Sequence, residues 1–594
     1  KGGALIVLGE DYGEGASIMQ ERTHAFAMKS QMWLLDPRPN LPAIVRAEEQ
    51  GFELSEASNT PVMLMLRVRA CHVYGRFIAK DNQRPAFSAK DALTVPSRDY
   101  SRIILPPSTY AQEQEKVRTR FPAALKFIAD SRMNEVIGGE LDDIGIVLQG
   151  GLYNGVLRAL ELSGHADSFG TSRVPLYVLN VTYPLLPDEF ARFCAGKRGV
   201  LIVEEGQPEF IEQAASQILR KHDLATKVFG KDCLPMAGEY TADVLRKGLA
   251  AFLKECGVTP PASAAAAKEI PLVPAAQLAA RVPARPPGLC TGCPERPFFS
   301  AMKILQREIG PMHISADIGC HSFATLPPFH MGNSIMGYGL GPAGASALSS
   351  VEGKRAVSVM GDGGFWHNGL TSGIGNAVFN RHDVVTVIVD NGYSAATGGQ
   401  DIPSSRGAAP HRQGGNSIVD AVKGVGAKWV KRVHTYDMRE TLAVMREAMT
   451  TDYRGPKVIV AEGECQLNRQ RRVAPQMKKA VREGKRVTRE RFGVDPETCT
   501  GDHSCIRLSG CPSLTLKDNP DPLRTDPVAH VDSSCVGCGV CGEVAHAAVL
   551  CPSFYSAELL YNPSRWDRLV SRLRALVIGA LQERAERRRM RYAI

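Results

Sequence analysis

The sequence predicts an α/β protein with several doubly wound domains and one small cysteine-rich domain. Its 594 residues exceed the size of a single domain, so several hydrophobic cores are expected. Short apolar runs alternate with helical patterns along most of the chain, which is typical of parallel sheets covered by helices. Seven of the fifteen cysteines fall within residues 499–551, a segment too small to fold on hydrophobic burial alone.

Composition and charge narrow the class of protein. Hydrophobic residues make up 44% and charged residues 22%, which is ordinary for a globular protein. No long apolar run or secretory leader is visible, so we expect a cytoplasmic protein without a membrane span. The net charge of +9 is concentrated in residues 469–491 and 565–591. A solvated linker and a surface helix explain these basic runs, and docking of an acidic protein partner is the alternative. The absence of a recognition motif argues against nucleic-acid binding.

The first half of the chain predicts two sheet domains. Residues 1–90 indicate part of a parallel-sheet domain that begins upstream of Lys1, and 91–140 a connection with a helix near 110–130. Within the first domain we expect strands at 3–8 and 61–67 and helices around 17–29 and 41–57. Residues 141–257 form the second domain, where a glycine-rich turn after Gln149 either binds phosphate or only turns the chain.

The second half begins after an alanine- and proline-rich linker at 258–288. A third α/β domain is expected at 289–468 and a basic linker at 469–494. The cysteine-rich domain follows at 495–560 and an amphipathic helix at 561–594. Trp566, Leu569, Leu573 and Val577 recur at helical spacing on the last helix, so we expect it to pack against a neighbour.

A glycine-rich turn joins the strand-like run Val357–Met360 to the next helix, and a second strand-like run ends at Asn391. The carboxyl ends of neighbouring parallel strands are where open α/β sheets bind ligands. Glycines there let backbone N–H groups approach a diphosphate at a helix N-terminus. Asp362 and Asn391 should then meet beside it, and a carboxylate, an amide oxygen and a main-chain carbonyl suit Mg²⁺.

This Gly-Asp-Gly and Asn arrangement resembles the thiamine-diphosphate motif. The resemblance implies that Asp362, Asn391 and the carbonyl of Tyr393 bind Mg²⁺. The stretch Ser394–Gln400 resembles the Thr-Gly-Gly-Gln segment of the 2-oxoacid:ferredoxin oxidoreductases. The residues thereby implied to contact the cofactor are Gly361, Asp362, Gly363, Gly364, Asn391, Tyr393, Thr397 and Gly398.

The C-terminal cysteines are spaced like those of a two-cluster ferredoxin. One [4Fe–4S] cluster is predicted on Cys535, Cys538, Cys541 and Cys511. The second site has the three cysteines Cys499, Cys505 and Cys551, with Asp502 in the position of the missing ligand. It predicts a [3Fe–4S] cluster, a [4Fe–4S] cluster completed by Asp502 or His503, or a structural remnant of a lost cluster.

A third cysteine group is scattered over the thiamine-type domain: Cys290, Cys293, Cys320 and Cys465. In the pyruvate enzymes of this superfamily, cysteines with similar placement bind a cluster next to the thiamine. The alternative is that these thiols only line the cofactor pocket, since free cysteine is often buried.

Over nearly its whole length the chain resembles the large (alpha) subunits of indolepyruvate ferredoxin oxidoreductases. The domain order matches: a pyrimidine-binding domain, a transketolase-C-like domain, a diphosphate-binding domain and a two-cluster ferredoxin-like domain. Residues 289–296 resemble that family's Cys-Pro-Gly-Cys-Pro-His-Arg segment, with Thr291 and Glu295 as departures.

The resemblance implies oxidative decarboxylation of an aryl 2-oxo acid, indolepyruvate or phenylpyruvate. The products would be the acyl-coenzyme A and carbon dioxide, with electrons passed through iron–sulfur clusters to ferredoxin. It also implies a smaller second subunit and a dimer of the large subunit. The glutamate that activates the thiamine pyrimidine is expected upstream of Lys1, so no catalytic residue is assigned.

Three alternatives remain open at this point. The substrate could be another 2-oxo acid. The chain could be a non-oxidative thiamine-dependent decarboxylase with a vestigial ferredoxin domain, against which the intact Cys535–Cys541 run speaks. It could also be mainly an electron-transfer subunit with an inactive thiamine domain, which the intact Asp362 and Asn391 oppose.

Overall fold

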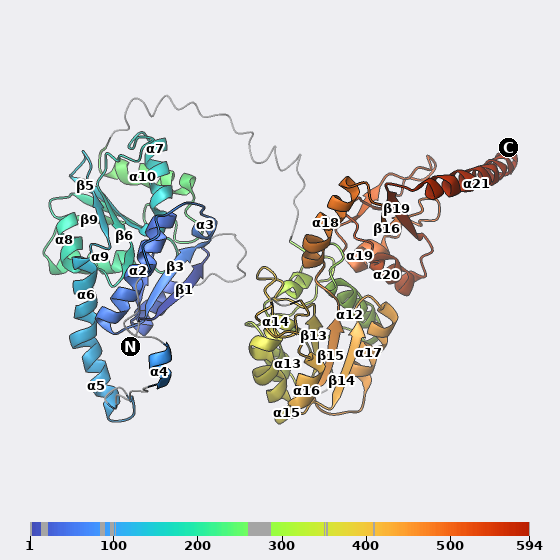
Figure 1. The fold of residues 1–594 in the computed structure, drawn as a ribbon, viewed down its shortest axis with the longest axis horizontal. Helices are drawn as coiled ribbons and strands as arrows, with labels where there is room; N and C mark the ends of the chain where they lie inside the picture. Colours follow the sequence, from blue (N-terminus) through green and yellow to red (C-terminus); the bar gives the residue numbers. More distant parts are fainter. Residues whose placement is uncertain are drawn as a thin grey trace. The chain divides into compact units, whose positions relative to one another are not determined.

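In a computed structural model the chain forms two compact units, Lys1–Leu278 and Ala279–Ile594 (Figure 1). The linker expected at 258–288 lies almost entirely outside the described residues. The structure describes residues 3–12, 22–82, 89–94, 100, 103–258, 287–349, 351, 354–407 and 410–592.

The first sheet of the first unit has the strand order β1-β3-β2-β7. Its strands are β1 (Leu5–Glu10), β3 (Val62–Arg67), β2 (Trp33–Leu35) and β7 (Val181–Tyr183). β1 and β2 run parallel to β3, whereas β7 is antiparallel to β2. The helices of this part are α1 (Thr23–Ser30), α2 (Leu41–Ser58), α3 (Val68–Cys71), α4 (Ala89–Thr94), α5 (Ser108–Glu115), the π-helical Lys116–Arg120 and α6 (Phe121–Asp130). The predicted pair of strands and the predicted helix near 110–130 are thus present.

The second sheet of this unit has the order β4-β6-β5-β8-β9 and is parallel except for β4. Its strands are β4 (Glu135–Ile137), β6 (Leu176–Leu179), β5 (Ile144–Gln149), β8 (Gly199–Val203) and β9 (Lys227–Phe229). Helices α7 (Tyr153–Leu162) and α10 (Ala242–Glu255) cover one face, and α8 (Pro187–Cys194) and α9 (Phe210–Lys221) cover the other. A parallel sheet with helices on both faces is doubly wound, in agreement with the predicted fold class.

The turn after Gln149 packs against the chain rather than standing open. A side chain at Gly150 would meet the carbonyl of Asp36 at 2.1 Å, and one at Gly151 would meet Arg67 at 2.4 Å. Close packing therefore requires both glycines, which favours the structural interpretation of this turn over phosphate binding.

The second unit contains a six-stranded parallel sheet of order β11-β10-β12-β13-β15-β14. Its strands are β11 (Ser334–Ile335), β10 (Ile314–Ala316), β12 (Val357–Gly361), β13 (Val385–Asp390), β15 (Lys457–Glu462) and β14 (Trp429–His434). Helices α12 (Glu295–Ile309) and α17 (Met438–Thr450) cover one face. The opposite side carries α13 (Gly341–Ala347), the π-helical Phe365–Gly375, α15 (Asn376–Phe379) and α16 (Ile418–Gly424).

The cysteine-rich part of this unit consists of two antiparallel strand pairs and two short helices. The strands are β16 (Val487–Val494), paired with β19 (Phe554–Tyr561), and β17 (Leu514–Lys517), paired with β18 (Val528–Val531). The short helices are α19 (Ser504–Ser509) and α20 (Val540–Val549). The α/β class with a small ferredoxin-like domain is thus confirmed.

The prediction of a linker at 469–494 was wrong. The segment forms most of helix α18 (Gln466–Arg482) and strand β16. Val487–Val494 pairs residue by residue with Phe554–Tyr561, far along the chain. A basic, weakly apolar strand shows no clear pattern in the sequence, because the hydrogen bonds that fix it come from a distant partner.

The C-terminal helix α21 (Arg565–Tyr592) extends away from the rest of its unit (Figure 1). Trp566 is 74% exposed and Leu573 56% exposed, so the expected packing against a neighbour is not seen among the residues that the structure describes. Among the described residues no helix has the length and apolar character needed to cross a membrane.

Buried ion pairs join the two sheets of the first unit near the carboxyl ends of their strands. Arg67, at the end of β3, pairs with Asp36 at 2.7 Å and also with Glu205, which follows β8. All three side chains are at most 5% exposed. The charges of Asp36 and Glu205 offset the cost of burying Arg67, because each buried charge has an opposite partner.

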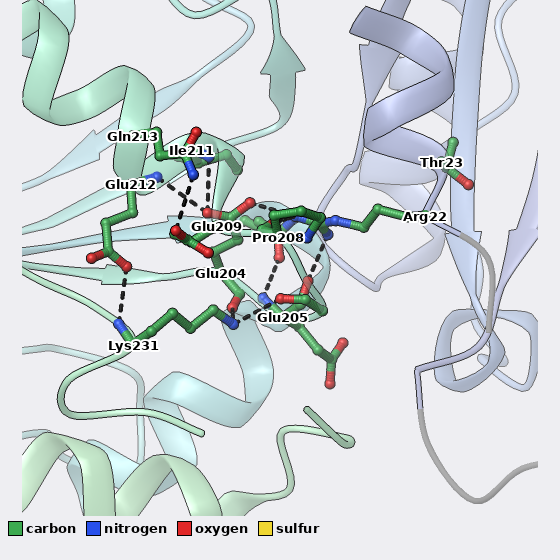
Figure 2. A network of polar contacts seen from close by, with 12 residues as sticks. Arg22, Thr23, Glu204, Glu205, Pro208, Glu209, Ile211, Glu212, Gln213 and Lys231 are labelled. Carbon is green, nitrogen blue, oxygen red and sulfur yellow. Dashed lines mark hydrogen bonds and ion pairs between the residues drawn. The ribbon is translucent and has the colours of Figure 1, made fainter. Parts of the chain in front are cut away.

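A second part of the same network surrounds Glu204 (Figure 2). Arg22 pairs with the Glu204 carboxylate, whose other oxygen accepts the N–H groups of Ile211 and Glu212 at 2.9 and 3.1 Å. Lys231 donates to the carbonyl of Glu204 at 2.6 Å. Burial lowers the pKa of Lys231 to about 8. Glu204 therefore holds the start of α9 while it neutralises Arg22.

We predict that Arg67→Met lowers the free energy of unfolding by about 3–5 kcal/mol, because it leaves Asp36 buried without its cation and Glu205 with Arg69 alone, at 3.2 Å. Urea unfolding followed by circular dichroism measures this loss in the first unit's transition. Lys126→Met is the control, since Lys126 and Asp130 are 77% and 63% exposed and such pairs contribute under about 1 kcal/mol. Equal stability of the two variants would contradict a structural role for the network.

Candidate cofactor site

Asp362 lies at the carboxyl end of β12, where the chain turns into the short helix α14 (Asp362–Gly364). Its carboxylate is 1% exposed and accepts the N–H of Gly363 at 2.9 Å. The N–H groups of Asn391 and Gly392 bind its other oxygen at 2.9 and 2.6 Å. Because β12 and β13 are parallel neighbours, their ends bring Asp362 and Asn391 together, as the sequence predicts.

Six of the eight predicted cofactor residues line one small cavity: Gly361, Asp362, Gly363, Gly364, Asn391 and Tyr393. Thr397 and Gly398 are exposed and lie in the turn that follows, outside this lining. Gly398 has φ +116°, a conformation that favours glycine. The Thr397 hydroxyl donates to the side-chain oxygen of Gln400 at 2.5 Å, so the Thr-Gly-Gly-Gln segment forms a turn with an internal hydrogen bond. Its contact with a cofactor stays a prediction.

The cavity also contains polar residues to which the sequence analysis assigned no role in the site: Glu295, His321, Tyr338 and Ser394. Asp317 lies beneath them, fully buried, and accepts the N–H of Gly339 at 2.8 Å. Cys320 is predicted as a cluster ligand, but no local pattern indicates that Asp317 and His321 pair, or that Glu295 at the start of α12 lies near them.

Burial and neighbouring charges shift the pKa values of this polar group. Burial raises the pKa of Glu295 to about 7, and its Oε2 atom has no hydrogen-bond partner. Burial alone would lower the pKa of His321, but the charge of Asp317, with which it pairs, raises it to about 9. The charge of Asp317 thus favours the protonated form of His321, and burial favours the neutral form of Glu295.

The residues around Asp362 suit a diphosphate and a magnesium ion. Burial, and then the charge of Asp390, raise the pKa of Asp362 well above its usual value, and a divalent cation would reverse this shift. A side chain at Gly364 would meet the Asp317 carboxylate at 2.1 Å, so the close packing of this loop against Asp317 requires glycine there. Oxygens of Asp362, Asn391 and Tyr393 are the hard ligands that Mg²⁺ prefers.

The four scattered cysteines gather beside this cavity. The pKa of Cys320 is raised by burial and then by the charges of Glu295, Cys465 and Cys290, and that of Cys293 by burial and by charges that include Cys320. Cys320 itself lines the cavity with Asp362. The Cys465 N–H donates to the carbonyl of Asn391 at 3.1 Å. Cys320 and Cys465 therefore lie next to the predicted magnesium residues, and Cys290 and Cys293 are close enough to share charge effects with Cys320.

The other two predicted groups also assemble. One small cavity is lined by Cys511, Cys535, Cys538 and Cys541, together with Arg296. In the second group, burial raises the pKa of Cys505 to about 12, and charges at Cys551 and Cys499 add to that effect.

The remaining predicted ligand, Asp502, accepts the N–H of Ser504 at 3.2 Å, and His503 contacts the carbonyl of Pro527 at 2.9 Å. Over the described ranges, no three His, Cys, Asp or Glu side chains are arranged to hold a single metal ion. Thiolates around a cluster of several irons stand farther apart than the ligands of one ion, so this finding concerns single-ion sites only.

The fold and this cavity define a thiamine-enzyme class of domain. Residues 317–461 match the family described as the thiamine pyrophosphate enzyme, C-terminal TPP binding domain. The match spans the strands β12 and β13 that present Asp362 and Asn391, and the chain therefore carries a TPP-binding domain.

Comparison of the whole chain gives more particular relatives. It is 28% identical over 570 residues to the indolepyruvate oxidoreductase subunit IorA of Pyrococcus horikoshii, a match covering 91% of this chain and 81% of that protein. The IorA subunit of Methanothermobacter marburgensis is also 28% identical, over 564 residues, covering 93% and 82%. The predicted resemblance to large subunits of the indolepyruvate type is confirmed.

Among solved structures, the 2-oxoglutarate:ferredoxin oxidoreductase of Magnetococcus marinus matches with a TM-score of 0.27 and 18% identity. That match covers 31% of this chain and 65% of the other. A likeness this low carries no inference about the present chain.

We predict that Gly364→Ala destabilises the cofactor-free protein by about 1–3 kcal/mol, because the added methyl group displaces Asp317 and breaks a buried hydrogen bond. Gly361→Ala is the matched control, since its methyl group would meet only His321, at 3.9 Å. Thermal unfolding of both variants measures the difference. A Gly364→Ala protein as stable as Gly361→Ala would show that the loop relaxes freely.

Proposed function

We propose that this chain is the thiamine-diphosphate-bearing large subunit of a 2-oxoacid:ferredoxin oxidoreductase that acts on indolepyruvate or phenylpyruvate. The reaction is oxidative decarboxylation to the acyl-coenzyme A and carbon dioxide, with electrons passed to ferredoxin. The observation that carries the proposal is that Cys320 lines the same cavity as Asp362 and Asn391. A source of electrons and a first acceptor would thus share one site.

In this proposal the end of the parallel sheet holds the cofactor. The Asp362 carboxylate, the Asn391 amide and the Tyr393 carbonyl would bind Mg²⁺, while Gly363 and Gly364 let the diphosphate approach the backbone. When bound, thiamine diphosphate supplies the electron sink for decarboxylation. Asn391 and Gly392 fix the Asp362 carboxylate through their N–H groups, so its oxygens are oriented before the metal binds.

Three cysteine groups would carry the electrons away one at a time. Cys290, Cys293, Cys320 and Cys465 would hold the cluster beside the thiamine, and Cys511, Cys535, Cys538 and Cys541 a [4Fe–4S] cluster. For Cys499, Cys505 and Cys551 a [3Fe–4S] cluster is favoured, because Asp502 is already bonded to Ser504 and His503 contacts the carbonyl of Pro527.

The proposal also includes further molecules. The relatives are named as subunits, which supports a second subunit here. A smaller size for that subunit and a dimer of the large subunit are further parts of the proposal. Ferredoxin and coenzyme A complete the reaction as electron acceptor and acyl acceptor.

We expect the purified complex to reduce ferredoxin or viologen anaerobically with an aryl pyruvate, coenzyme A, thiamine diphosphate and Mg²⁺. Comparing indolepyruvate, phenylpyruvate, pyruvate and 2-oxoglutarate in the same assay measures the substrate class. Activity with pyruvate or 2-oxoglutarate alone would overturn the aryl assignment. Release of carbon dioxide without reduction of any acceptor would instead indicate a non-oxidative decarboxylase.

We predict that Asp362→Asn weakens Mg²⁺-dependent thiamine diphosphate binding by at least about 100-fold, since loss of outer-shell groups alone costs roughly 10- to 100-fold in metal affinity. Isothermal titration calorimetry of the cofactor-free protein measures the change. Glu447→Gln is the control: this carboxylate lies on α17, is 47% exposed and pairs with Lys431 at 3.5 Å. Unchanged binding by Asp362→Asn would remove the assigned ligand.

A further inference from the structure

Arg296 is a buried cation at the start of α12, and no part of the proposed function uses it. Its side chain is 1% exposed, and it is among the largest fully buried side chains of the described residues. A guanidinium keeps its charge in proteins. The N-terminal end of a helix carries partial positive charge, so α12 adds to the cost of burying a cation at this position.

The contacts of Arg296 connect two of the cysteine groups. Its Nε donates to the carbonyl of Cys290 at 3.2 Å, and its Nη1 donates to the carbonyl of Ser509 at 3.0 Å. Cys290 belongs to the group beside the thiamine cavity, whereas Ser509 lies two residues before Cys511. One planar side chain thus fixes the backbone of both groups, which a guanidinium does better than an ammonium.

The charges near Arg296 come mainly from thiols. Burial lowers the pKa of Arg296, but the charges of Cys511, Cys538, Cys293 and Cys541 raise it, and the net direction is upward. In return, Arg296 lowers the pKa values of Cys293, Cys538 and Cys541 against the larger effect of burial. Arg296 also lines the cavity formed by Cys511, Cys535, Cys538 and Cys541.

An iron–sulfur cluster held by four thiolates is an anion whose negative charge grows by one on reduction. A fixed positive charge beside it stabilises the reduced form more than the oxidised form. Net charge and hydrogen bonds around a cluster are among the factors that set its reduction potential, and the effect is large where water is excluded.

We propose that Arg296 is a positioning residue that holds the two cysteine groups at a fixed separation and raises the reduction potential of the cluster on Cys511, Cys535, Cys538 and Cys541. This inference rests on the proposed function, because it requires that cluster. It goes further by naming the residue that makes this cluster the favoured acceptor for electrons from the group beside the thiamine.

The test is a potentiometric titration of the anaerobically purified complex, followed by electron paramagnetic resonance of the reduced clusters. The paramagnetic resonance signal that changes in a Cys538→Ser variant is assigned to the cluster that Cys538 binds. Arg296→Met should reduce its equilibrium constant for reduction by about tenfold or more, which is a shift of about 59 mV or more to lower potential for one electron. Arg296→Lys keeps the charge and should restore most of the potential.

Lys303→Met is the matched control. Lys303 lies on the same helix and donates to the carbonyl of Arg507 at 3.4 Å, and the charges that lower its pKa after burial are Arg307 and Arg507 rather than thiols. Its replacement removes a cation from α12 and should leave the potential unchanged. Comparing the two variants therefore separates the effect of a charge beside the cluster from the effect of removing any cation from α12.

A loaded Arg296→Met protein with an unmoved potential would overturn this inference and leave the proposed function standing. A wild-type complex without iron or cluster signals would overturn both. If Arg296→Met does not load its cluster, Arg296→Gln and Arg296→Lys are compared instead. Equal potentials in that pair would assign Arg296 a purely structural role, which also overturns the inference.

Discussion

The parallel pairing of β12 with β13 is the constraint on which the candidate site depends. Gly361 lies opposite Val389 in this register, so the residues that follow each strand emerge at the same edge of the sheet. Asp362 is then bound by the N–H groups of Asn391 and Gly392. A shift of one residue would turn the side chains to opposite faces of the sheet and separate the carboxylate from the amide.

Helix α12 connects this edge to the cysteine-rich domain. At its start, Glu295 lines the cavity that contains Asp362, and Arg296 lines the cavity formed by Cys511, Cys535, Cys538 and Cys541. Adjacent residues of a helix project about 100° apart, so one turn of α12 serves two sites. Ser300, one turn further, donates to the carbonyl of Leu508 at 2.8 Å and fixes the helix against α19. In the proposed function the path of the electrons is therefore built around a single helix end.

Buried charge recurs in both units, with different consequences. In the first unit Arg67 is neutralised by two carboxylates, so its charge is satisfied within the chain and serves to join two sheets. In the second unit the neighbours of Asp362 are N–H groups and the like-charged Asp390, so its charge is only partly compensated and its pKa is raised. Uncompensated buried charge is costly unless a ligand supplies the opposite sign, which is why such residues indicate binding sites.

Sequence alone determined the α/β class, the strands that present Asp362 and Asn391 and the spacing of the clustered cysteines, because these are local patterns of hydrophobicity and residue type. The tertiary structure decided what depends on distant partners. Strand β16 exists through its pairing with β19, and Thr397 and Gly398 fall outside the cavity. Asp317, His321 and Arg296 acquire their neighbours only when β10, η5 (Cys320–Thr325), α12 and α19 pack together. Burial and non-local contact, which fix charge and pKa, have no signature in local sequence.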